Sequence, residues 1–196
     1  MQQTKSAPRT NRDRTEATRG ALLDAARGLF VSKGYGETST PEVSAAAGTT
    51  RGALYHHFAD KRDLFRQVLM RENEAVAADI RAAAPSGSTP RDALIAGSDA
   101  YLHAMSAPGR TRLLLIEGPA VLGMTEMVAM DEASSAATLR EGLTAAGVGV
   151  GAEGVSLDAL SGLLSAAFDR AALEIDGGAD PAQTRDAVLW LLGRVL

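Results

Sequence analysis

Apolar residues recur at intervals of three and four along most of the chain, which is the spacing of one face of an α-helix. The clearest stripe lies in residues 15–32 and consists of Leu22, Leu23, Ala26, Leu29 and Phe30. Similar stripes cover residues 61–84, 157–175 and 180–195. Runs of β-branched or aromatic residues, which mark strands, are scarce. The pattern therefore predicts an all-α fold with about nine helices.

Residues that break helices divide this pattern. The sequence PSGSTP at 85–90 is the clearest interruption, and residues 147–154 form a glycine-rich loop. Between these breaks the pattern predicts helices, one of them interrupted at Gly118 and Pro119. The first residues are polar and carry no apolar stripe, which is typical of a flexible segment. We therefore expect an N-terminal arm (1–13), a small helical domain (14–71) and a larger helical domain (72–196).

Residues 39–58 predict two short helices joined by a tight turn. Ser39 followed by Glu42 matches a capping box, in which each side chain accepts a hydrogen bond from the other residue's backbone N–H. Gly48 suits the end of the first helix because it can adopt a positive φ angle. Thr49 or Thr50 then caps the second helix, which is expected over residues 51–58.

The two faces of this helix pair differ in chemistry. The expected inner face is apolar and consists of Val43, Ala46, Ala47, Leu54 and Phe58. The expected outer face carries hydroxyl, basic and aromatic side chains: Thr49, Thr50, Arg51, Gly52, Tyr55 and His56. A second helix with such an outer face suits the major groove of DNA. The segment is thus predicted to be a helix-turn-helix.

Residues 14–70 resemble the DNA-binding domain of the TetR family of transcriptional regulators. The matching segments are LFVSKGY at 29–35, TS at 38–39, AAAG at 45–48, RGALYHHF at 51–58, and Lys61 ahead of LF at 64–65. Thr40 and Thr49 depart from the usual family pattern, in which an apolar residue is common. Beyond residue 70 the resemblance is weak.

We predict which residues of this domain contact DNA. The set is Ser39, Thr49, Thr50, Arg51, Gly52, Tyr55, His56 and Lys61. Arg51 is suited to bidentate reading of guanine, and Gly52 lets the helix backbone approach the groove. Lys61, near the start of the next helix, suits a phosphate contact. The resemblance implies the same role for Tyr55 and His56, whose positions usually grip phosphates in the family.

Charge is distributed unevenly along the chain. The net charge is −4, but residues 1–71 carry 12 Lys and Arg against 7 Asp and Glu, whereas residues 72–196 carry 8 against 17. A basic segment attached to an acidic body indicates that only the first third meets a polyanion. This agrees with double-stranded operator DNA as the partner of that segment.

Several classes of function are disfavoured by what the sequence lacks. There is no cysteine, no apolar run of the length that spans a membrane, and no apolar core in the first residues that would make a secretory signal. A cytoplasmic protein without membrane contact is expected. Catalytic and metal-binding motifs are also missing, and His103 with Glu117 is the only candidate acid–base pair in the larger domain. We expect no enzyme activity, no cofactor and no metal site.

The larger domain carries candidate residues for a small-molecule cavity. They are Tyr101, His103, Met105, Glu117, Met124, Met127 and Phe168. Such cavities are mostly apolar with a few polar groups; methionines adapt to varied shapes, and Glu117 is suited to orient a cationic or hydroxylated ligand. The alternative is that each of these residues belongs to an ordinary core.

These observations predict a ligand-responsive DNA-binding regulator, a repressor released from a near-palindromic operator by a small-molecule effector. The resemblance implies a homodimer through the last two helices, whose apolar stripes exceed what one small bundle needs. Two alternatives stay open. One is a constitutive or architectural DNA-binding protein without an effector, and the other is a small-molecule-binding protein or enzyme built on the same scaffold.

Overall fold

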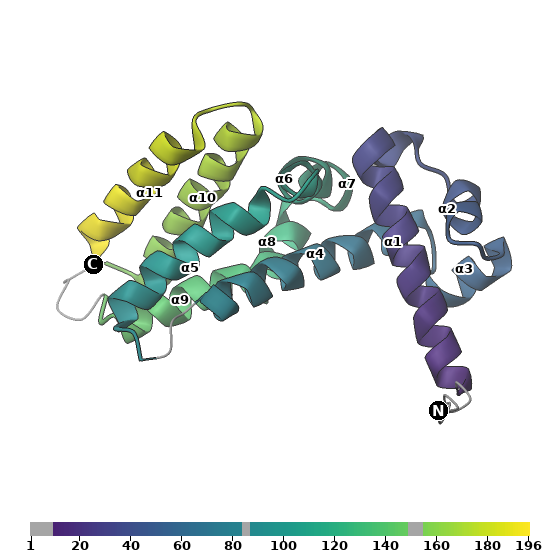
Figure 1. The fold of residues 1–196 in the computed structure, drawn as a ribbon, viewed down its shortest axis with the longest axis horizontal. Helices are drawn as coiled ribbons and strands as arrows, with labels where there is room; N and C mark the ends of the chain where they lie inside the picture. The colour runs from purple at the N-terminus through teal and green to yellow at the C-terminus, as the bar shows by residue number, and fades with distance from the viewer. Residues whose placement is uncertain (1–9, 84–86, 149–154) are drawn as a thin grey trace, which may run out of the picture. The chain divides into compact units, whose positions relative to one another are not determined.

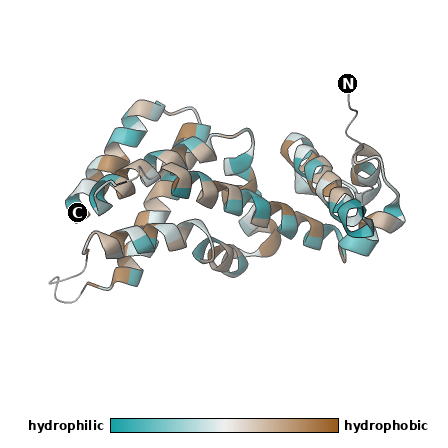
Figure 2. Cartoon of the chain, turned by 60° about the horizontal axis from the view of Figure 1, so that its bottom comes forward, coloured by the Kyte–Doolittle hydropathy of each residue, from teal (hydrophilic) through white to brown (hydrophobic). Residues whose placement is uncertain are grey.

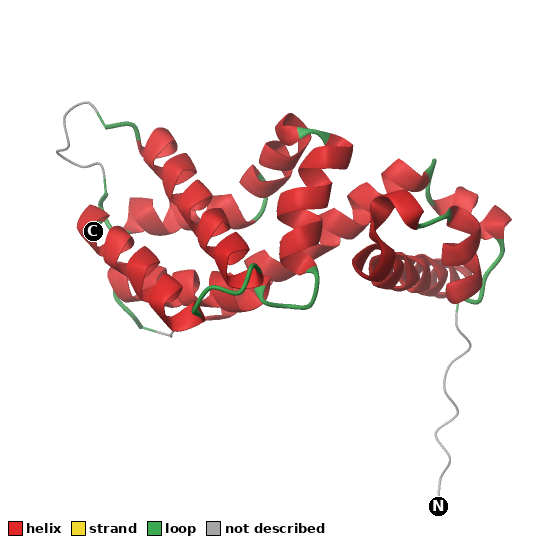
Figure 3. Ribbon diagram, turned by 90° about the horizontal axis from the view of Figure 1, so that it is seen from above, coloured by secondary structure: helices red, strands yellow, loops and turns green. Residues whose placement is uncertain are grey.

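The computed structural model of the chain describes residues 10–83, 87–148 and 155–196 (Figure 1). Its elements are helices α1 (Asn11–Glu37), α2 (Thr40–Ala46), α3 (Arg51–His57), α4 (Lys61–Ala83), α5 (Pro90–Met105), α6 (Arg110–Arg112), the π-helical turn η1 (Leu113–Glu117), α7 (Gly118–Leu122), α8 (Met124–Glu132), α9 (Ser135–Ala145), α10 (Leu157–Asp176) and α11 (Pro181–Val195). The described part of the chain contains helices and loops and no strand (Figure 3). The predicted all-α class is confirmed.

Helix α1 begins earlier than the apolar stripe predicts. Thr10 forms a capping box with Asp13: the Thr10 N–H donates to Asp13 Oδ2 at 2.8 Å, and the Asp13 N–H donates to Thr10 Oγ1 at 3.2 Å. The helix thus includes residues 11–13, which the polar pattern predicts as part of the arm; residues 1–9 lie outside the described residues. Gly34, with φ of 81°, interrupts the helix, and a further helical turn follows it.

The first of two compact units ends at Val68. Its core is aromatic, with the Phe30 and Phe65 rings packed edge to face at 5.0 Å and Tyr35 at 4.9 Å from Phe65. The expected inner face of α2 and α3 is only partly correct: Val43, Leu54 and Phe58 are buried, but Ala46 is exposed and Ala47 is half-buried. Ser44 is buried instead, with its hydroxyl donating to the Thr40 carbonyl at 3.0 Å.

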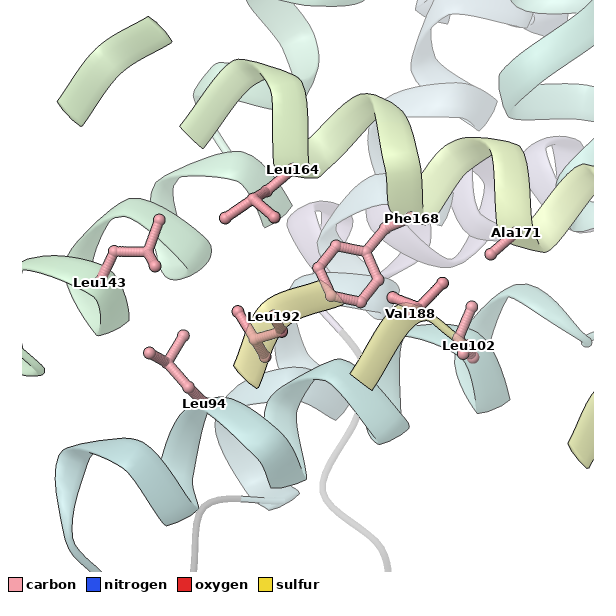
Figure 4. Packing of buried hydrophobic residues seen from close by; sticks show 8 residues of the cluster. All are labelled: Leu94, Leu102, Leu143, Leu164, Phe168, Ala171, Val188 and Leu192. Atoms are coloured by element: carbon pink, nitrogen blue, oxygen red, sulfur yellow. The ribbon is translucent and has the colours of Figure 1, made fainter. Parts of the chain in front are cut away.

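The second unit begins at Leu69 and is a bundle of α-helices. Apolar and polar residues alternate along its helices (Figure 2). Four helices, α5, α9, α10 and α11, meet in one cluster, which consists of Leu94, Leu102, Leu143, Leu164, Phe168, Ala171, Val188 and Leu192 (Figure 4). Helices α10 and α11 lie side by side and are joined by a short turn (Figure 1). Both contribute apolar side chains to the cluster, as their stripes predict.

The segment that the pattern predicts as a helix interrupted at Gly118 and Pro119 is instead divided into η1, α7, α8 and α9. The π-helical turn lies just before Pro119, whose missing N–H removes one helical hydrogen bond. Gly123, with φ of 91°, then separates α7 from α8. Gly118 allows a close approach, because a Cβ atom there would lie 2.8 Å from Met127 Cε. These short pieces raise the helix count above the nine expected.

Within the described residues, no helix combines the length and the apolar character needed to cross a membrane.

Replacing Leu143 by alanine tests the apolar cluster. Leu143 is 0% exposed, so Leu143→Ala should lower the free energy of unfolding by about 2–5 kcal/mol through lost burial and a cavity. Thr144→Ala, at the exposed neighbouring position, is the matched control and should change it by less than about 0.5 kcal/mol. Denaturant unfolding at fixed protein concentration measures both. Equal effects of the two substitutions would contradict this packing.

Candidate functional site

The start of α2 is fixed by a charged cap that also connects it to α1. The Ser39 N–H donates to Glu42 Oε2 at 3.0 Å and the Glu42 N–H donates to Ser39 Oγ at 3.4 Å, which completes the predicted capping box. The Ser39 hydroxyl also donates to Glu42 Oε2 at 2.8 Å. Lys33 Nζ, on α1, lies 2.5 Å from Glu42 Oε1. The ammonium of Lys33 and then the hydrogen bonds from Ser39 lower the pKa of Glu42 to about 2. The Ser39 hydroxyl is thus engaged within the protein.

Helix α3 is held by its own cap and by one buried side chain. The turn before it contains Gly48, with φ of 63°. Of the two candidate caps, Thr50 is the N-cap, since its Oγ1 accepts from the Ala53 N–H at 3.1 Å. Leu54 is fully buried, whereas Arg51, Gly52, Tyr55 and His56 are exposed. The predicted outer face therefore lies on one exposed surface of α3.

Tyr55 is oriented by contacts on both sides. Its hydroxyl lies 3.1 Å from Thr40 Oγ1, and the Arg51 guanidinium lies 5.4 Å from its ring centroid. Hydrogen bonding with Thr40, and then with Arg51, lowers the pKa of the Tyr55 phenol. This contact gives Thr40, a departure from the family pattern, a physical role that sequence reasoning missed: a buried hydroxyl that positions an exposed aromatic residue.

The remaining basic residues near this face differ in their surroundings. Lys61 Nζ donates to the Gly36 carbonyl at 3.2 Å and lies 4.3 Å from the Tyr35 ring centroid. His57 is half-buried, and burial followed by the nearby His56 lowers its pKa. Thr49 is half-buried in the turn. Lys61, by contrast, is packed against Tyr35. An ammonium group has three N–H donors, and the bond to the Gly36 carbonyl uses one of them.

Among the cavities of the second unit, two that lie between α4, α5, α8, α9 and α10 share lining residues. The larger measures about 500 Å³ and the smaller about 370 Å³. Side chains from α5, α8, α9 and α10 line both, namely Tyr101, Asp131, Ser135, Ala136 and Ser165. Helix α4 also contributes: Asn73 and Val76 line the larger cavity, and Ile80 lines the smaller.

Five of the seven predicted ligand residues line these cavities. Tyr101 lines both, Met105, Met124 and Met127 line the larger, and Phe168 lines the smaller. His103 and Glu117 do not line either one. His103 is exposed. It lies two positions after Tyr101 on α5, and that spacing places the two side chains on nearly opposite sides of the helix. Glu117 pairs instead with Arg112 Nη2 at 2.8 Å.

The polar groups that line the larger cavity include two aspartates, Asp131 and Asp169, that sequence reasoning missed. The Tyr101 hydroxyl donates to Asp169 Oδ1 at 2.5 Å. Asp131 accepts hydrogen bonds from Ser135 at 2.6 Å and from Ser165 at 3.2 Å. Burial raises the pKa of Asp169 to about 6, and the Asp131 charge adds to the increase, while the Tyr101 hydrogen bond opposes it. Burial and the charge of Asp169 also raise the pKa of Tyr101 well above its ordinary value.

The only sequence feature that marked Asp169 was its position in the apolar stripe of residues 157–175, directly after Phe168. A carboxylate within such a stripe is unusual, because a buried charge is costly unless it is paired.

Two family patterns cover most of the chain. Residues 22–68 match the bacterial regulatory proteins of the tetR family, and residues 91–196 match the tetracyclin repressor-like C-terminal domain. The second match alone spans more than half of the chain. A helix-turn-helix regulator with a separate helical unit is the class that these matches define. The chain belongs to the TetR family, which confirms the resemblance of residues 14–70.

Curated relatives match only part of the chain. The transcriptional regulator AcrR of Shigella flexneri is 45% identical over 60 residues, which are 31% of this chain and 28% of AcrR. The alignments with the first curated relatives span between about a quarter and a half of their lengths. These relatives are transcriptional regulators, not enzymes.

Solved structures match over nearly the whole chain. A TetR-family transcriptional regulator from Pectobacterium atrosepticum is 29% identical, with a TM-score of 0.68 and 96% of each chain covered. The regulator LfrR from Mycobacterium smegmatis, solved in complex with proflavine, is 22% identical, with a TM-score of 0.64 and 92% of this chain and 97% of LfrR covered. The likeness to LfrR is one of fold alone.

The cap of α2 should make stability depend on pH. The pKa of Glu42 is about 2 in the folded chain against an ordinary 4.5. Its ionised form therefore favours folding above pH 4.5, and this contribution is lost as the pH falls toward 2. Glu42→Gln should lower the Tm at pH 6, and its difference from the unsubstituted chain should shrink between pH 4.5 and pH 2. Thermal unfolding followed by circular dichroism measures this.

Glu37→Gln, at an exposed position at the end of α1, is the control for a general loss of negative charge. An equal fall in Tm for both variants at pH 6 would show that the cap has no special role.

Proposed function

We propose that the chain is a ligand-responsive repressor. It binds a near-palindromic operator as a homodimer and leaves that operator when a small molecule occupies the second unit. The observation that carries the proposal is the exposed face of α3, where Arg51, Tyr55 and His56 are presented by a capped helix anchored at Leu54. Such a regulator acts where the chromosome lies, so the proposal also places it in the cytoplasm and assigns it no catalytic reaction.

Base reading falls to Arg51, whose guanidinium suits bidentate contact with the O6 and N7 atoms of guanine. Thr49 and Thr50 contact a thymine methyl group or a phosphate. Gly52 lets the backbone approach the groove, since only the Thr50 hydroxyl, at 3.8 Å, would contact a Cβ atom there. The family match over residues 22–68 supports this assignment.

Phosphate contacts fall to Tyr55, His56, Lys61 and Ser39. Tyr55 is already oriented by Thr40 and Arg51, so little side-chain entropy is lost when it binds. Lys61 contributes its remaining N–H donors from a position above Tyr35. The N–H and hydroxyl of Ser39 both donate to Glu42 Oε2, so a phosphate contact by Ser39 requires its hydroxyl to turn away from Glu42. The excess of basic residues in the first 71 positions supports the same surface.

The homodimer forms through α10 and α11. These helices bury one face in the apolar cluster, but Leu163 is 71% exposed and Trp190 is 62% exposed. Leu191 is also exposed, and Arg194 lies over the Trp190 ring at 4.7 Å. Exposed side chains of this size favour burial against a second copy, which places two α3 helices on one operator. The resemblance to the family supports the same pair of helices.

Effector release depends on α4. This one helix carries Lys61 at its start and cavity-lining residues Asn73, Val76 and Ile80 further along. A ligand that favours one position of α4 therefore changes the spacing of the two α3 helices and lowers affinity for the operator. The proflavine complex of LfrR supports a small molecule as the effector class.

The operator experiment tests the DNA-binding part directly. Footprinting of the chain on DNA upstream of its own gene, at two salt concentrations, should give a protected near-palindrome whose binding weakens steeply with salt. Arg51→Ala should weaken specific binding by about 1–3 kcal/mol and relax the base preference at one position of each half-site.

Arg91→Ala removes an exposed arginine of the second unit and is the control. It should leave operator binding unchanged. Equal weakening by Arg51→Ala on every DNA sequence would reduce Arg51 to a phosphate contact, and an absence of any protected site would remove the function proposed here.

The dimer is tested by a double substitution on its exposed face. Leu163→Ala combined with Trp190→Ala should convert a dimer into a monomer in sedimentation equilibrium and abolish operator protection. The helix content should stay unchanged because both side chains are exposed. Val155→Ala, an exposed apolar residue outside both helices, is the control and should remain dimeric. A double variant that stays dimeric would contradict this interface.

A further inference from the structure

We propose that the larger cavity takes a lipophilic cation: an apolar molecule with a protonated amine that faces Asp169 and Asp131 and with a hydrogen-bond acceptor that faces Asn73. The inference rests on the proposed function, since it names the chemical class of the effector. It is carried by three features of the cavity: its apolar wall, its uncompensated carboxylates and a buried donor without a partner.

The wall of the larger cavity is apolar and adaptable. Eight of its twenty lining residues are large aliphatic or thioether side chains: Val76, Met105, Leu114, Leu115, Met124, Met127, Val128 and Leu173. At about 500 Å³ the cavity has the size of small-molecule sites. A ligand for this cavity is therefore largely hydrophobic.

The carboxylates face this space without a cationic partner among the hydrogen bonds and ion pairs of the described residues. Asp169 accepts from the Tyr101 hydroxyl, and Asp131 accepts from the Ser135 and Ser165 hydroxyls. Glu132 also lines the cavity, and the single basic residue in its lining is Arg170, which is exposed and pairs with Glu174. Asp131 and Asp169 are half-buried, and withdrawing a carboxylate from water costs free energy unless a positive charge compensates it. A ligand cation supplies that charge.

Asn73 is an independent sign of a polar ligand group. This residue is 6% exposed and lines the same cavity from α4. Its Nδ2 atom has no hydrogen-bond partner among the described residues. A buried donor left unpaired is unfavourable, and native structures contain few of them. An ether or carbonyl oxygen on the ligand satisfies it.

Other ligand classes fit the cavity less well. An anionic ligand such as a fatty acid would bring a further negative charge to Asp131, Glu132 and Asp169. A neutral hydrocarbon would leave both the carboxylates and Asn73 uncompensated. The three charge states of one skeleton therefore discriminate between these classes.

The experiment compares 6-phenoxyhexylamine, 6-phenoxyhexanol and 6-phenoxyhexanoate by isothermal titration calorimetry on the full chain without DNA at pH 7.5. The amine should bind about tenfold tighter than the alcohol, and the carboxylate weakest of all. This comparison needs no variant, so it does not depend on how a substitution folds. Binding of the alcohol or the carboxylate as tightly as the amine would overturn the proposal.

Two substitutions assign the effect to residues. Asp169→Asn should cost the amine about tenfold in affinity and leave the alcohol unchanged. Asp176→Asn, the same change at an exposed position of α10, should change neither affinity.

Asn73→Leu tests the acceptor part of the proposal. The unsubstituted chain should prefer 6-phenoxyhexylamine over its carbon isostere 7-phenylheptylamine by about threefold to tenfold, and Asn73→Leu should remove this preference. Without that preference in the unsubstituted chain, the acceptor part of the proposal fails.

The pH dependence gives a separate readout. Because the pKa of Asp169 is raised to about 6, its protonation should weaken binding of the amine between pH 7.5 and pH 5. The other ionisable groups of the lining are Tyr101 on α5, Asp131 and Glu132 on α8, and Arg170 on α10. Asp169→Asn should flatten the profile. An unchanged profile in that variant would remove Asp169 from the site.

Operator release separates this inference from the function on which it rests. If the amine binds but the operator stays bound, the effector part of the proposed function fails and the cavity assignment stands. If another ligand class releases the operator and the amine does not bind, the cavity assignment alone fails.

Discussion

The candidate DNA-reading surface depends on the anchoring of a helix too short to be stable by itself. Helix α3 has seven residues, and isolated helices of that length are marginal in water. Its conformation comes from the Thr50 cap at one end, the burial of Leu54 in the middle, and the contact of Tyr55 with Thr40 on α2. Lys33 and Glu42 in turn connect α2 to α1, which carries Phe30 of the aromatic core. The exposed side chains of α3 are therefore held in position by this core.

The helix-turn-helix was predictable because the interactions that define it are local in sequence. The Ser39–Glu42 capping box and the Thr50 cap each join residues three positions apart, and the positive φ angle of Gly48 belongs to a single residue. The true start of α1 is equally local, but Thr10 and Asp13 lie in a polar stretch where no apolar stripe draws attention to them.

The cavity was less predictable because its polar contacts join distant segments. Tyr101 and Asp169 are 68 residues apart, and Asp131 meets Ser165 across 34 residues. The helical spacing alone shows that Tyr101 and His103 cannot line the same cavity, because residues two positions apart point to different sides of α5. The three methionines that were grouped by their apolar setting line one cavity, whereas Glu117 pairs with a neighbour, Arg112.

The broken helical segment between Arg110 and Glu132 separates the residues that shape the cavity from those of the helix-turn-helix. Leu114, Leu115, Met124 and Met127 line the cavity from η1 and α8, and the segment is already interrupted by the π-helical turn, Pro119 and Gly123. Substitutions there reshape the cavity and leave the sequences of α1, α2 and α3 unchanged. Under the proposed function, a lineage can thus acquire a new effector while its DNA-binding surface is preserved.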